Sequence, residues 1–154
     1  MEMPLPTDAH RKLQKLVGSW TGEERMRPSP WDPAGGIAIG RVRNVSALDG
    51  FAVVQDYEQE RGGRVTFRGH GIFWWDASSS AYVLHWFDSM GQAPNEFRGT
   101  FDAGVLSLVS YGVQGNARAV WDFRQPGGYL YRLEMSPDGV VWQALMEASY
   151  TLDA

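Results

Sequence analysis

The sequence predicts an all-β protein, a roughly ten-stranded antiparallel up-and-down barrel with a short N-terminal helix closing one end. The chain contains seven Trp, six Tyr and seven Phe beside 18 Gly. Aromatic residues favour pleated, half-buried surfaces, and glycines supply the positive φ angles of tight turns. A hydrophobic period of 3.6 stops at Gly18 and gives way to a period of two, and turn-forming residues then recur at short intervals.

The helix signal extends from about Asp8 to Val17. Thr7 is a candidate N-cap, and an acidic residue suits the first helical turn. One apolar stripe follows the positions i, i+4, i+7 and i+8, formed by Ala9, Leu13, Leu16 and Val17. Gly18 is the expected C-terminal stop. Because Trp20 follows at once, we expect it to pack beneath the helix as a plug in one end of the barrel.

The rest of the chain reads as short strands separated by turns. The expected strands lie near residues 19–26, 37–47, 51–60, 64–75, 81–88, 96–101, 105–111, 118–124, 129–135 and 140–151. Breaks such as Asp49-Gly50 and Gly62-Gly63 have hairpin-turn composition. A long antiparallel meander avoids exposed edges best by closing on itself. No repeat or linker divides the chain, so residues 1–154 are expected to form a single domain.

Hairpin register sorts the side chains into two faces. A three-residue loop at residues 61–63 would pair Tyr57 with Phe67 and place matched charges on the opposite face, Asp56 against Arg68 for example. Continued alternation places one set of mostly aromatic side chains inside: Gln55, Tyr57, Tyr82, Trp86, Trp121, Tyr131, Trp142, Ala144 and Tyr150. After the turn at residues 102–104, Val105 and Leu106 both remain candidates for the inward position.

The inward set is the candidate ligand-binding lining. Tyr and Trp give an apolar wall with hydroxyl and indole groups that can bond a ligand. A filled aromatic core would give the same sequence pattern. A ten-stranded barrel is wider than an eight-stranded one, whose side chains can just fill it, and this favours a cavity.

Glu24 is the candidate polar contact inside the barrel. It lies on the same side of the first strand as Trp20. A carboxylate in the interior would need a raised pKa or a cationic partner, for which Arg41 and Arg43 on the next strand are candidates. The alternative places Glu24 near the rim, in water.

The residues do not favour a metal site, a redox site or a nucleophilic catalytic site. The chain has no cysteine. His70 and His85 fall diagonally on one face, but Arg68 shares that face, and two ligands without a nearby carboxylate make a poor metal site. No catalytic motif occurs. We therefore predict no metal, no cofactor and no catalytic residue, and an enzyme is the less favoured reading.

Charge and hydropathy limit the partners. Fourteen basic and eighteen acidic residues give a formal charge of -4, mixed along the chain, so a nucleic-acid partner is not expected. No apolar run approaches the ~20 residues of a membrane span, and the N-terminus lacks the pattern of a secretory signal. A cytoplasmic protein that does not contact membranes is expected.

Several segments resemble one family. These are "LVGSWTGEE", "GHGIFWWD", "HWFDSMG", "FRGTFDAGVLSL" and "SPDGVVWQALMEASYTL". They resemble the bacterial proteins catalogued as domain of unknown function 1579, which are similar to the calycin group of lipocalins, fatty-acid-binding proteins and nitrobindins. Gly18-Ser19-Trp20 matches the calycin Gly-x-Trp signature. The resemblance implies a calycin-like barrel in which Gly18 and Trp20 are structural.

The chain departs from the better-known calycins. Nitrobindins bind haem through a histidine near the C-terminal end of the barrel, and no histidine follows His85 here. Fatty-acid-binding proteins place a two-helix lid where this chain has "RPSPWDPAGG". The expected function is therefore binding of an apolar or amphipathic small molecule, a fatty acid included. The alternatives are a filled-barrel interaction module acting as a homodimer and, less favoured, a cofactor-dependent enzyme.

Overall fold

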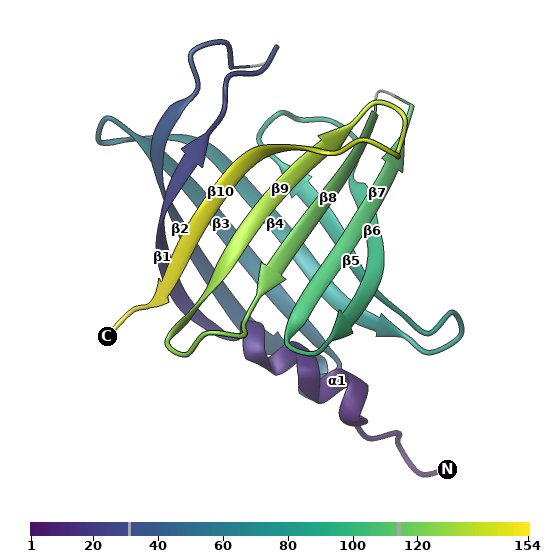
Figure 1. The fold of residues 1–154 in the computed structure, drawn as a ribbon. Helices are drawn as coiled ribbons and strands as arrows, with labels where there is room; N and C mark the ends of the chain where they lie inside the picture. The colour runs from purple at the N-terminus through teal and green to yellow at the C-terminus, as the bar shows by residue number, and fades with distance from the viewer. Residues whose placement is uncertain (31, 114) are drawn as a thin grey trace.

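The computed structural model describes residues 1–30, 32–113 and 115–154, so Trp31 in the first long link and Gln114 in a predicted turn lie outside the described residues. Ten antiparallel strands form one closed barrel (Figure 1), which confirms the predicted fold class. The strands are β1 (Gly18–Met26), β2 (Gly36–Ala47), β3 (Ala52–Arg61), β4 (Arg64–Asp76), β5 (Ala81–Asp88), β6 (Asn95–Asp102), β7 (Val105–Gly112), β8 (Gly115–Asp122), β9 (Gly128–Ser136) and β10 (Gln143–Leu152).

The strand order is that of a simple meander. Each strand pairs with its neighbours in the sequence, and β1 pairs with β10 to close the barrel, with Gly22 opposite Tyr150. Closure leaves no sheet edge unpaired, which is the physical reason for a long meander to curl into a barrel. All connections from an odd-numbered to an even-numbered strand therefore gather at one end of the barrel, away from the helix (Figure 1).

The N-terminal helix α1 (Asp8–Leu13) continues as a 3-10 turn (Gln14–Leu16) and lies across the lower end of the barrel in Figure 1. Thr7 is the N-cap as predicted, and its backbone N–H donates to Nδ1 of His10 at 3.0 Å. The regular helix is shorter than the sequence stripe indicates because its last turn tightens. Leu13 and Leu16 are 1% and 0% exposed and face the barrel.

Trp20 plugs this end, as expected. Its side chain is 7% exposed, and its indole N–H donates to the carbonyl oxygen of Leu16 at 2.9 Å. The Nδ2 group of Asn44 donates to the same oxygen at 2.8 Å. A carbonyl at a helix C-terminus has no partner within the helix. The barrel supplies two donors for it, so the helix and the barrel end are joined by specific bonds as well as by apolar packing.

The register of β3 and β4 differs from the prediction by two residues. Tyr57 lies opposite Gly69, and Phe67 lies opposite Gln59. The turn is the two-residue Gly62-Gly63, with both φ angles positive, and the extra residue is Thr66, which forms a bulge on β4 opposite Gln59 and Glu60. Because the shift is even, the predicted inward side chains remain inward. The predicted β4–β5 register, with Trp75 opposite Tyr82, is confirmed.

A second irregularity moves Trp142 and Ala144 out of the interior, so their predicted inward placement is wrong. The β9–β10 register shifts between Ala144 and Met146, and Ala144 lies opposite Glu134 on the outer face. Trp142 precedes β10, and the guanidinium carbon of Arg118 lies 4.5 Å from its ring centroid. The bulge inserts one residue and therefore reverses the alternation on its N-terminal side.

The turn at residues 102–104 is resolved in favour of Leu106. Phe101 and Leu106 are opposite each other and point inward, and both are buried. From this strand onward the alternation agrees with the sequence until the bulge in β10. Ala119 and Trp121 on β8 and Tyr129 on β9 are buried in the same apolar cluster. The core therefore occupies the helix-closed half of the barrel.

Candidate ligand-binding interior

Glu24 is fully buried within the barrel, at 0% exposure. The Tyr57 hydroxyl donates to it, at 2.7 Å from Oε1 and 2.9 Å from Oε2. Nε2 of Gln59 donates to Oε1 at 3.0 Å, and the Tyr150 hydroxyl donates to Oε2. Three donors thus serve the two carboxylate oxygens, with the single Tyr57 proton shared between them, and this makes burial of the group tolerable. The rim placement weighed in the sequence analysis is wrong.

Small residues make the space for this cluster. Glu24 lies opposite Ala38 on β2 and Ala148 on β10. Gly40 lies where a Cβ atom would collide with the Tyr150 hydroxyl and with Oε2 of Glu24. Two strands with small inward residues therefore allow a long acidic side chain and two tyrosines to meet inside the wall.

The expected cationic partners, Arg41 and Arg43, are not partners of Glu24. Both alternate with the inward residues Val42 and Asn44 and so point outward, and Arg41 forms an ion pair with Glu60. Strand alternation forbids an arginine at these positions from reaching the interior. Neutral donors take the role that the sequence analysis assigned to a cation.

The tyrosines of the cluster are held in their neutral form. Burial, followed by the nearby charge of Glu24, raises the pKa of Tyr57 and Tyr150 above the ordinary value of 10.0. The same two causes, in the same order, raise the pKa of Tyr131. These hydroxyls therefore remain hydrogen-bond donors throughout the physiological pH range.

Aromatic rings line the interior beyond the cluster. The Trp86 ring lies over Gly69, which has no Cβ to obstruct it, and the ring centroids of Tyr57 and Trp86 are 6.1 Å apart. The centroids of Trp121 and Tyr131 are 5.3 Å apart. Tyr57, Trp86 and Tyr131 point inward and yet are only partly buried. Tyr57 and Trp86 are therefore not fully packed, and Tyr131 also lines a groove on the outer face.

Several interior polar groups have no protein partner among the described residues, including Oδ1 of Asn44, which lies opposite Gln55. Gln55 is 5% exposed, lies opposite Gly71, and its side-chain amide makes no hydrogen bond there. The Tyr131 hydroxyl also makes none with the described residues. Buried polar groups normally find a partner. Gln55 and Tyr131 therefore keep unused hydrogen-bonding capacity on the inward face.

Tyr82 belongs to the closed end of the barrel. Its hydroxyl donates to the carbonyl oxygen of Ala9 at 2.8 Å, and its ring packs at a tilt against Trp75, with centroids 4.7 Å apart. The hydroxyl is thus used to hold the helix in place. The sequence correctly predicted its inward direction but could not show which end it serves.

Gln59 and Gly40 were missed by the sequence analysis. Gln59 follows Tyr57 on the inward face and completes the shell of Glu24. The signal for Gly40 was present: Ala38 and Gly40 occupy inward positions of a strand whose outward positions carry bulky residues. Small inward residues on a barrel strand indicate that a large side chain from elsewhere fills the space.

The outer face of the barrel carries paired charges. Nδ1 of His70 lies 2.8 Å from Asp56, and His85 stacks on Trp74 with centroids 6.0 Å apart. In the part of the chain that the structure describes, no three His, Cys, Asp or Glu residues gather as a metal site would require.

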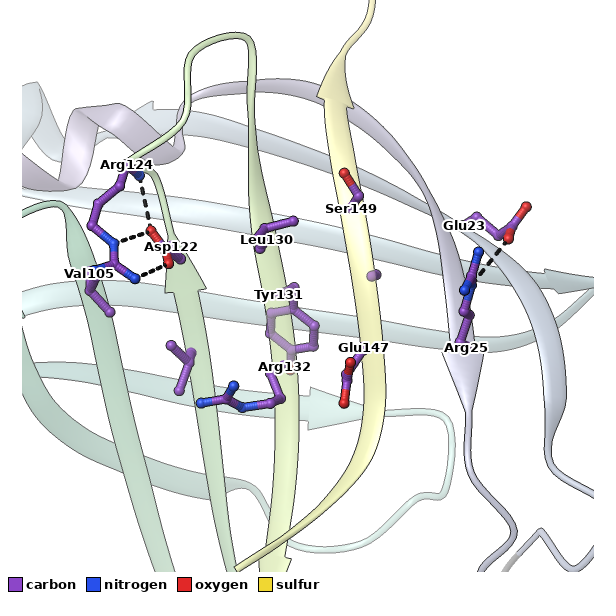
Figure 2. Close-up of a pocket in the computed structure, with 12 residues that line it drawn as sticks. Glu23, Arg25, Val105, Asp122, Arg124, Leu130, Tyr131, Arg132, Glu147 and Ser149 are labelled. Carbon is purple, nitrogen blue, oxygen red and sulfur yellow. Dashed lines mark hydrogen bonds and ion pairs between the residues drawn. The ribbon is translucent and has the colours of Figure 1, made fainter.

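An outer groove of about 480 Å³ crosses β7 to β10 and β1. Figure 2 shows its charged side chains joined to one another, Asp122 to Arg124 and Glu23 to Arg25. These charges are paired with each other and face solvent, whereas Glu24 lies inside with neutral partners only.

The fold and this interior define a calycin-like barrel. Residues 5–151 match the family described as Protein of unknown function (DUF1579), and the chain belongs to that family. The match extends over nearly the whole barrel and its helix. It confirms the resemblance read from the sequence segments.

Two solved structures share the fold. The crystal structure of Rv2717c from M. tuberculosis is 13% identical with a TM-score of 0.73, over 98% of this chain and 100% of that one. The S-type phycobiliprotein lyase CPES from Guillardia theta is 13% identical with a TM-score of 0.61, over 96% of this chain and 94% of that one. No curated protein matches the chain. None of the described helices is long and apolar enough to cross a membrane.

Proposed function

We propose that the barrel binds an apolar or amphipathic small molecule in its interior, reached from the end opposite the helix. One observation carries this proposal: Tyr57 and Trp86 point inward and are only partly buried, whereas Trp20 and Tyr82 at the helix end are 7% and 5% exposed. A packed core leaves few voids larger than a water molecule. Accessible aromatic surface inside a barrel supports a place for a ligand.

The proposed contacts fall into two groups. Trp86, Trp121 and Tyr57 would supply the apolar wall, and Gln55 with Tyr131 would supply hydrogen bonds. Glu24 and Tyr150 lie behind them as a buried polar cluster. A structural neighbour named as a phycobiliprotein lyase supports ligand handling by a barrel of this shape, although at 13% identity the likeness concerns the fold alone. We further propose that residues 1–154 act as a single domain in the cytoplasm.

Binding of N-phenyl-1-naphthylamine, a neutral apolar dye, tests the proposal. Burial of apolar groups contributes about 0.8 kcal/mol per methylene-sized unit before ordering costs, so we expect affinity in the micromolar range. Dye fluorescence should rise and tryptophan fluorescence should fall on titration. Energy transfer from Trp86 and Trp121 is the expected cause.

A matched pair of substitutions locates the site. Ala117 points inward near the open end, opposite Met135, whereas Ala144 points outward. Ala117→Trp should abolish dye binding with the fold retained, and Ala144→Trp should leave binding unchanged. If the wild type binds no dye and Ala117→Trp unfolds the protein, the interior is full. A filled-barrel module acting as a homodimer would then be the better account, and sedimentation would show the dimer.

A further inference from the structure

Between the two ends of the barrel, Glu24 is the charged inward side chain among the described residues. Twelve of the fourteen basic residues lie on the outer face, in a connecting segment or on the helix at the closed end: Arg11, Lys12, Lys15, Arg25, Arg27, Arg41, Arg43, Arg68, Arg98, Arg118, Arg124 and Arg132. The other two, Arg61 and Arg64, lie opposite each other where β3 and β4 reach the open rim, and Arg61 forms an ion pair with Asp32 there. Inside, Glu24 lies in the wall. At the open rim Asp88 shares the face of Trp86 and accepts its indole N–H at 2.9 Å.

The Glu24 cluster fits a charged carboxylate. Its two oxygens accept bonds from Tyr57, Tyr150 and Gln59, and Nε2 of Gln59 also donates to the Tyr57 oxygen at 3.1 Å. All three donors lie against the carboxylate. The Tyr57 oxygen already accepts a hydrogen bond from Gln59. Neutral donors stabilise the charge without cancelling it, so its field persists in the interior.

We infer that the barrel selects neutral or cationic amphiphiles and rejects anionic ones; this inference rests on the proposed function. An anionic head group would lose its hydration inside and meet like charge with no cation to pair with. A hydroxyl head group can bond the Gln55 amide and the Tyr131 hydroxyl at no such cost. An ammonium group is attracted by the carboxylate even without touching it, because charges interact strongly where water is excluded.

Three ligands with one alkyl chain test this selectivity: decan-1-ol, decylamine and decanoate, each displacing the bound dye at neutral pH. We expect decylamine and decan-1-ol to bind at least about tenfold more tightly than decanoate, equivalent to about 1.4 kcal/mol. Glu24→Gln should reduce the difference between decan-1-ol and decanoate. Glu23→Gln is the control, because the Glu23 side chain lies on the outer face, where it is paired with Arg25.

A reverse substitution keeps the test decisive if Glu24→Gln does not fold. Ala117→Lys places a cation at an inward position near the open end and should raise decanoate affinity selectively. Decanoate binding as tightly as decan-1-ol to the wild type would overturn the inference while leaving the proposed function intact. Binding of neither decan-1-ol nor the dye would overturn both.

Discussion

The two ends of the barrel carry the same kind of alternating sequence in different surroundings. At the closed end, alternating aromatic residues meet Leu13 and Leu16 of the helix, and the polar atoms of Trp20 and Tyr82 are bonded to it. At the open end, Tyr57 and Trp86 alternate in the same way and stay partly accessible. The difference is the helix, which brings two leucines and two carbonyl acceptors to one end only.

This contrast shows what periodicity can and cannot express. Alternation fixes which side chains point inward. Whether inward residues form a core depends on what closes the space above them, and that comes from a segment remote in the sequence. Function is then expected at the end where burial is incomplete, because there the interior still has surface to offer.

Trp20→Ala should have the largest effect on stability. Replacing a buried aromatic side chain by alanine costs about 3 to 5 kcal/mol, and here the acceptor at Leu16 also loses a donor. Trp86→Ala at the open end should cost no more than about half as much. Urea unfolding of both variants measures the contrast. Equal losses would mean that the two ends are packed alike.

Alkaline pH should have the second-largest effect, by destabilising the middle of the barrel. The pKa values of Tyr57, Tyr131 and Tyr150 are raised above 10.0 in the folded protein. Their contribution is complete below pH ~10 and falls as the pH rises above it, by about 1.4 kcal/mol per pH unit for each tyrosine that keeps its proton. Phenolate absorbance followed with circular dichroism should show these tyrosines ionising together with unfolding. Ionisation of all six at constant secondary structure would contradict the burial described here.

Gly40→Ala should have an intermediate effect. The added methyl group would overlap the Tyr150 hydroxyl and the Glu24 carboxylate, and overpacking of this kind costs about 1 to 3 kcal/mol. Adding Tyr150→Phe should recover part of the loss, since it removes one of the overlapping atoms. Thermal unfolding of the single and double variants measures this coupling. Strict additivity of the two losses would show that Gly40 does not serve the cluster.

Trp142→Ala should have the smallest effect. Its ring stacks on Arg118 at the surface, and an exposed cation–π contact contributes about 0.5 to 1 kcal/mol. The variant should retain dye binding and nearly all of the ligand-induced fluorescence change, in contrast to Trp121→Phe. Loss of dye binding in Trp142→Ala would return this residue to the interior, where the sequence alone had placed it.

Most of the architecture was accessible from the sequence because local signals agree. Gly18 ends the helix, and turn glycines separate runs with a clear period of two. The two bulges were not accessible, because one inserted residue leaves the residues around it compatible with either alternation. For that reason Trp142 and Ala144 were assigned to the wrong face, while Tyr129 and Tyr131 on the regular strand β9 were assigned correctly.

The candidate site was only partly accessible. Glu24 was identified from its alternation with Trp20, but its partners Tyr57, Gln59 and Tyr150 come from strands far apart in the sequence. Choosing neutral donors over Arg41 or Arg43 required knowing which strands are adjacent and what space Gly40 leaves. The sequence analysis included a fatty acid among the expected ligands for the same reason. Without the partners of Glu24, the net charge of the interior could not be predicted.

The most direct test of an interior open at one end is the position of a heavy atom on a bound neutral ligand. Crystals of the protein soaked with a bromine-terminated decanol would locate the ligand by the anomalous signal of bromine. The account predicts a bromine peak inside the barrel, between Trp86 and the Phe73–Trp121 pair whose centroids are 5.5 Å apart. Bromine peaks confined to the outer faces, with the interior filled by side chains, would contradict it.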